Sequence, residues 1–101
     1  MHLIEILLPL NDETGHPFPS ELYDGLAQEL TDKFGGVTSF TRAPAEGRWK
    51  DATSTEHDII AIIEVMAEQL ERGFWSELKR RLMSEFKQDE VVIRSQTIEL
   101  L

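Results

Sequence analysis

The sequence predicts a small α+β protein with the ferredoxin-like element order β-α-β-β-α-β, a two-layer sandwich. Two stretches repeat apolar residues every four positions, as helices do, and four apolar or β-branched stretches surround them in that order. Short connections and right-handed crossovers favour one arrangement of such elements, with both helices on one face of an antiparallel sheet. Numbered along the chain, the strands are expected in the spatial order 4-1-3-2, within a single domain that spans 1-101.

The first strand and the first helix follow directly from the pattern. Leu3 to Leu10 is apolar apart from one glutamate, which indicates a strand. Apolar residues then recur every four positions from Leu22 to Phe34, which indicates a helix, and Ser20 is its expected N-cap. Gly35 and Gly36 end this helix, because glycine adopts a left-handed C-terminal cap without strain.

The middle of the chain predicts two further strands. Val37 to Arg42 is rich in β-branched and aromatic residues, and Ala43-Pro44 interrupts it. Gly47 to Lys50 is expected to resume as an extended and more exposed arm. Asp58 to Met66 contains four isoleucines and a valine, which indicates a central strand.

The last third of the chain predicts a helix and a strand. Apolar residues recur every four positions from Leu70 to Phe86, although Gly73 weakens the first turn and leaves the start of the helix open. Glu90 to Ser95 is the expected last strand. The apolar tail, Ile98 to Leu101, is expected to extend that strand or to pair with the sheet edge of a partner.

Composition excludes several classes of function. The 101 residues contain no cysteine, which rules out disulfides, thiolate metal sites and cysteine nucleophiles. The net charge of −9 argues against a nucleic-acid partner, whose phosphates require lysine and arginine. No apolar run has the ~20 residues of a membrane span, and the first residues do not resemble a signal peptide. We therefore expect a cytoplasmic protein with no cofactor, because no phosphate-binding loop or nucleophile motif is present.

Half of the basic residues lie close together in the second helix. They fall between Arg72 and Lys87 and alternate with Glu77 and Glu85. This pattern predicts a solvated helix face, with pairs four residues apart such as Glu77 and Arg81.

Three segments resemble a family of small bacterial proteins of unknown function. These segments are Phe34-Gly-Gly-Val-Thr38, Gly47-Arg-Trp-Lys-Asp51 and Phe86-Lys-Gln-Asp-Glu-Val-Val-Ile93. The resemblance extends over most of the chain and implies the same β-α-β-β-α-β layout. It implies no catalytic residue.

Alternation along the strands predicts an apolar sheet face that the helices leave open. The purely apolar sets, such as Ile4, Ile6 and Leu8, are expected to face the helices. The open face then carries a second apolar set: Leu3, Leu7, Ile60, Ile62, Val92 and, depending on the phase of its strand, Phe40. So much contiguous apolar surface favours a homodimer joined through its sheet faces, as in dimeric α+β barrels.

Four charged residues are expected to form a row across the same open face. In spatial order they are Arg42, Glu64, Glu5 and Arg94. Two carboxylates flanked by guanidinium groups suit either a site for a small polar molecule or an ion-pair row that fixes the strand register. Trp49, between two cations, is a candidate lid over this site or an anchor for a partner, and its alternative role is packing over the sheet edge.

Histidines give little support for a metal site. His2 and His57 are expected to begin neighbouring parallel strands and so to lie at one end of the sheet, but their spacing matches no zinc motif. His16 is expected to belong to the turn before the first helix. We therefore expect no metal.

Two functions remain open from the sequence. The first is a homodimeric module that binds a small molecule or a protein partner. The second is a cofactor-independent enzyme of the dimeric α+β-barrel type, an isomerase or monooxygenase acting on a small organic substrate. Its cavity would be lined by Glu5, Glu64, Arg42, Arg94 and Trp49.

Overall fold

The computed structural model describes residues 1–39, 45–50 and 55–101, with the backbone alone for 38–39, 45–50 and 55–59. The described elements, in chain order, are β1 (His2–Pro9), α1 (Ser20–Phe34), β2 (Thr38–Ser39), β3 (Ala45–Lys50), β4 (Thr55–Ala67), α2 (Arg72–Glu85) and β5 (Val92–Thr97). The prediction of a small α+β fold with two helices and an antiparallel sheet is confirmed.

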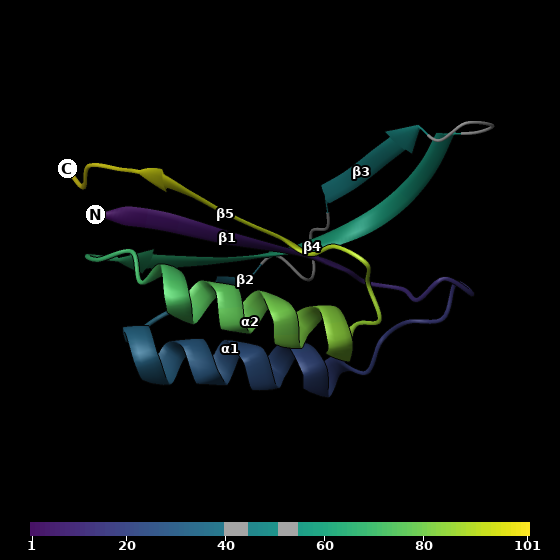
Figure 1. Cartoon of the computed structure of the whole chain (residues 1–101), viewed down its shortest axis with the longest axis horizontal. Coiled ribbons are helices and arrows are strands. Elements are labelled where there is room, and N and C mark those ends of the chain that lie inside the picture. Colours follow the sequence, from purple (N-terminus) through teal and green to yellow (C-terminus); the bar gives the residue numbers. More distant parts are fainter. Residues whose placement is uncertain (40–44, 51–54) are drawn as a thin grey trace.

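The sheet is antiparallel at every described pairing. Its strands lie in the order β2-β4-β1-β5, and β3 pairs with the first half of β4. Figure 1 shows α1 and α2 side by side under one face of the sheet, and no described element covers the opposite face. We call this opposite face the open face. Both ends of the chain lie at the same end of the molecule, where the Ile98 amide donates to the Met1 carbonyl at 3.0 Å.

The residues expected to form an extended arm belong to an additional strand, β3, which brings the number of strands in the sheet to five. Residues of β3 pair with the start of β4, from Ala45 opposite Ile60 to Lys50 opposite Thr55. Because this pairing gives the extra residues a neighbour, β4 begins at Thr55 and not at Asp58. The resulting hairpin rises away from the helices and extends beyond the two-layer part of the molecule (Figure 1).

The ends of α1 differ in how well the sequence predicts them. Gly35 has φ of 84°, and its amide donates to the Thr31 carbonyl at 2.7 Å, as expected of a left-handed cap. The prediction of Ser20 as N-cap is wrong. Pro19 occupies the cap position without a side-chain hydrogen bond, and its carbonyl accepts the first hydrogen bond of the helix from the Leu22 amide at 3.1 Å.

The core lies between the helices and the covered face of the sheet. The strand faces are oriented as predicted, since alternate residues of β1 and β4 are buried while their neighbours are not. The Phe86 ring fills the end of this layer, in contact with the rings of Phe18 and Tyr23 at 5.1 and 5.2 Å between centroids. The fully or nearly buried residues are Ile4, Ile6, Leu8, Tyr23, Leu26, Leu30, Ala61, Ile63, Val65, Ala67, Trp75, Leu78, Leu82, Phe86 and Val91.

Polar contacts of α2 differ in detail from the prediction. Arg81 pairs with Glu29 of α1 and with Glu85 at 3.6 Å, and Glu77 pairs with Arg80 at 3.1 Å. Glu77 is therefore not the partner of Arg81. Neither described helix combines the length and the apolar character that crossing a membrane requires.

Candidate functional site

A row of charged residues crosses the two central strands and one edge strand of the sheet. The strand register places Glu5 of β1 directly opposite Glu64 of β4 on one side and Arg94 of β5 on the other. Three of the four residues proposed from the sequence for this row therefore occupy adjacent positions. We call Glu5, Glu64 and Arg94 the charged row.

Within the charged row, one carboxylate is paired. Arg94 Nε donates to Glu5 Oε1 at 3.2 Å. The Glu5 side chain is only 18% exposed, whereas that of Arg94 is 56% exposed, so the arginine reaches from the edge strand over a half-buried carboxylate. None of the described cations forms an ion pair with Glu64. The described part of the row thus carries two negative charges and one positive charge.

The other two residues proposed from the sequence for this site, Arg42 and Trp49, are not part of the described row. Arg42 lies outside the described residues, as does Phe40 of the predicted apolar face. Thr38 is the residue of β2 that pairs with Glu64. Trp49 belongs to β3, opposite Glu56, so its backbone is part of the projecting hairpin.

The charged row lies among apolar side chains on the open face. Leu3, Leu7 and Ile62 are half-buried around it, and Met66 and Val92 are 51% and 46% exposed. Leu3 and Met66 lie on one side of the row, and Leu7, Ile62 and Val92 lie on the other. Apolar side chains gathered on one face are typical of surfaces that bind another molecule. The apolar open face predicted from the sequence is therefore present, with Met66 as an addition.

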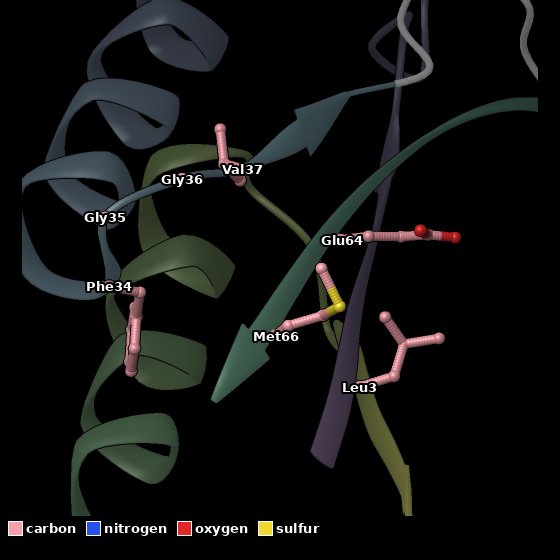
Figure 2. Close-up of a pocket in the computed structure, with 7 residues that line it drawn as sticks. All are labelled: Leu3, Phe34, Gly35, Gly36, Val37, Glu64 and Met66. Carbon is pink, nitrogen blue, oxygen red and sulfur yellow. The ribbon is translucent and has the colours of Figure 1, made fainter. Parts of the chain in front are cut away.

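A hollow of about 460 Å³ opens beside Glu64, where β4 passes the end of α1. Figure 2 shows Leu3 and Glu64 extending to one side of β4, while the segment from Phe34 to Val37 lies on the other side. Met66 lies between them and also lines the hollow. The hollow therefore joins the open face to the connection between α1 and β2.

The hollow exists because the chain leaves α1 at a distance from β4. The left-handed Gly35 turns the backbone out of the helix, and β2 then pairs with β4 only at Glu64 and Ile63. Toward the end of β4, Val65 to Ala67 pair with β1 on one side but have no described strand neighbour on the side of β2. The hollow extends over this free edge, from the Phe34–Val37 segment to the side chains of Leu3 and Glu64.

Sequence reasoning missed the residues that give this hollow its walls. Phe34, Val37 and Met66 have the spacing of ordinary core or strand residues, and nothing in the pattern separates them from the others. The available signal was the double glycine before a short strand, since a helix that ends in a left-handed cap turns the chain sharply.

The histidines do not form the arrangement considered from the sequence. β1 and β4 are antiparallel, His2 lies opposite Ala67, and His57 lies opposite Arg48 in the hairpin. The expectation that His2 and His57 begin parallel strands is therefore wrong. Among the described residues, no three histidine, aspartate or glutamate side chains are close enough together to hold a metal ion.

A compact polar network fills the turn before α1. Asp12 Oδ1 accepts hydrogen bonds from the amides of Thr14 and His16 at 2.8 and 3.0 Å and from the Thr14 hydroxyl at 2.6 Å. The Thr14 hydroxyl and these amides hold the pKa of Asp12 below its usual value. Thr14 Oγ1 also contacts His16 Nδ1 at 2.6 Å. His16 thus belongs to this turn, as predicted.

Solved structures with this fold include two different kinds of protein. A variant of CutA1 from Pyrococcus horikoshii OT3 matches the whole chain at 13% identity, over 86% of its own length, with a TM-score of 0.59. A phage SAM lyase in complex with S-methyl-5'-thioadenosine matches 94% of the chain at 18% identity, over 79% of its own length, also with a TM-score of 0.59. The apo form of a phage SAM lyase gives 15% identity and a TM-score of 0.58 over 94% of the chain. At these identities the likeness establishes the fold, a small ferredoxin-like α+β sandwich.

No protein-family model matches the sequence, and no curated protein matches it significantly. The resemblance to a family of small bacterial proteins therefore stays a prediction. The shared fold does not choose between a binding protein and an enzyme.

Proposed function

We propose that this chain is a cytoplasmic homodimeric module that binds a small molecule beside the charged row of its open face. In this proposal, two ferredoxin-like sandwiches with the strand order 4-1-3-2 pair through their open faces as a dimeric α+β barrel. The observation that carries the proposal is the combination of exposed apolar side chains and a half-buried ion pair on a face that no described element covers.

Two features support a ligand in addition to a second copy of the chain. The hollow beside Glu64 has a volume of about 460 Å³, within the range of roughly 300–1,000 Å³ that is typical of small-molecule sites. Its walls are mainly apolar, with one carboxylate to fix orientation. Apolar walls with a few polar groups are typical of small-molecule sites.

The test is a thermal-shift screen of a metabolite library with the native protein and with Glu5→Gln and Glu64→Gln. A ligand of this site should raise the melting temperature of the native protein and should do so less in Glu64→Gln. A ligand that stabilises all three proteins equally binds elsewhere and contradicts the proposed site. Val92→Lys, on the same face, shows whether a change in melting temperature comes from the association of two copies or from the ligand.

An enzyme is the second candidate, and the juxtaposed carboxylates favour it. Glu5 and Glu64 are direct neighbours across two strands, an arrangement that can supply an acid and a base. The phage SAM lyase shows that this fold can carry an enzyme, so its substrate and S-methyl-5'-thioadenosine belong in the screen. Loss of a library compound over time, abolished in Glu5→Gln and Glu64→Gln, would establish catalysis.

A further inference from the structure

The hollow beside Glu64 is lined by one charged group, apolar side chains and glycine backbone. Leu3, Phe34, Val37 and Met66 supply the apolar walls, and Gly35 and Gly36 supply backbone. The Glu64 carboxylate is the only charge among the described lining residues. A ligand that matches this lining has an apolar body and a single complementary charge.

The charges of the described residues around Glu64 indicate the sign of that complementary charge. Like charges directly opposite each other on neighbouring strands are unfavourable, and Glu5 lies opposite Glu64. Arg94 hydrogen-bonds to Glu5 and leaves Glu64 unbalanced among the described residues. The chain as a whole carries a net charge of −9, which attracts cations and repels anions. The described residues therefore favour a ligand that brings a positive charge.

The lining also indicates what kind of cation fits. A metal ion needs several oxygen or nitrogen ligands, but Glu64 is the single carboxylate in the described lining. The described residues offer no group of metal-binding side chains elsewhere on this face. Apolar walls suit instead a cation whose charge is surrounded by carbon, such as a sulfonium or a quaternary ammonium group.

We propose that the hollow binds an organic cation, with its charged centre at the Glu64 carboxylate and its apolar part against Leu3 and Met66. This inference rests on the proposed ligand-binding function and names the class of ligand. Glu64 is the residue that determines specificity, because it distinguishes a cation from a neutral molecule of the same shape.

The experiment compares molecules that differ in charge and little else. S-adenosylmethionine is paired with S-adenosylhomocysteine, which lacks the sulfonium methyl group, and choline is paired with the neutral 3,3-dimethylbutan-1-ol. Affinities are measured by calorimetry with the native protein and with Glu64→Gln. Glu21→Gln is the matched control, because it removes the same charge at the other end of α1, about 20 Å along the helix from Phe34.

We expect at least one cation to bind the native protein about tenfold or more tightly than its neutral counterpart. In Glu64→Gln the two members of that pair should bind alike, whereas Glu21→Gln should keep the preference. If no cation binds better than its neutral counterpart, or if Glu64→Gln keeps the preference, the inference is wrong.

The outcomes also separate this inference from the proposed function. If neutral or anionic compounds of the library bind and Glu64→Gln weakens them, the module binds ligands there but the cation assignment fails. A third outcome is that no compound binds and that Glu64→Gln changes the mass of the protein in solution. In that case Glu64 contacts a cationic side chain of a second copy. That result would overturn both proposals for the hollow.

Discussion

Tyr23 brings a hydroxyl group into the core of the molecule. Its side chain is buried, and its hydroxyl donates to the carbonyl of Pro9, at the end of β1. Burial raises the pKa of Tyr23 to about 12, since the ionised form would lose its hydration. Ionisation of the hydroxyl therefore lowers the stability of the folded chain.

Stability is predicted to fall between pH 10 and about 12 because of this residue. Below pH 10 the tyrosine is neutral in both the folded and the unfolded chain, so it adds no pH dependence. Above pH 10 it ionises first in the unfolded chain, which lowers the free energy of unfolding until the folded pKa is reached. Tyr23 is the only tyrosine, so its absorbance reports its ionisation directly.

Tyr23→Phe should lower the free energy of unfolding by about 1 kcal/mol at neutral pH, the net value of one hydrogen bond. It should also remove the tyrosine contribution to the alkaline loss of stability. Urea unfolding of both proteins at matched concentration, from neutral pH to about 12, measures the difference. A difference that does not change above pH 10 would refute the assigned pKa.

Apart from the N-cap of α1, single residues were predicted well where local chemistry decides and poorly where the third dimension decides. The Gly35 cap and the turn role of His16 follow from local spacing. Alternation placed Glu5, Glu64 and Arg94 on one face, but their adjacency depends on the strand register, which only the structure gives. The partner of Arg81 does not, because Glu29 lies on the other helix, 52 residues away in the sequence.

At the scale of elements, the sharp end of α1 shapes the candidate site. Gly35 has φ of 84°, a conformation that costs an L-residue about 1 kcal/mol or more, and no atom lies within 4 Å of a Cβ added there. Gly36 is also free of close atoms and lacks the positive φ. The two neighbouring glycines therefore differ in backbone conformation alone.

Gly35→Ala should lower the free energy of unfolding by about 1 kcal/mol, and Gly36→Ala should leave it unchanged or raise it slightly. Thermal or urea unfolding of the two variants provides the comparison. Equal effects of the two substitutions would contradict the role of the left-handed cap.

The sequence predicted both helices and the core strands, but it did not predict that β3 pairs with another strand. Helices and central strands have strong periodicity or continuous apolar runs, whereas Ala45 to Lys50 has neither. Its strand character depends on pairing with the start of β4, which periodicity does not reveal. The hollow was missed for the same reason, since it depends on where β2 stops pairing.

At the scale of the whole molecule, the open face is the surface through which we propose that two copies associate. Val92 lies on this face at the edge strand and is 46% exposed, so a lysine there should leave the isolated fold intact. In a sheet-face dimer the same lysine would bury a charge against apolar side chains, which is strongly unfavourable.

Val92→Lys should therefore lower the mass in solution while the circular dichroism spectrum stays native. Ser84→Lys adds the same charge to an exposed position of α2, on the covered side of the sheet, and should leave the mass unchanged. Size-exclusion chromatography with light scattering measures both variants. The same mass for Val92→Lys and the native protein would place the interface elsewhere.

The most direct test of the account is the mass of the native protein in solution at micromolar concentration. Light scattering should give twice the 11.6 kDa of one chain, since the apolar open face is predicted to be buried between two copies. A stable monomer at that concentration would contradict the sheet-face dimer and the function proposed for it.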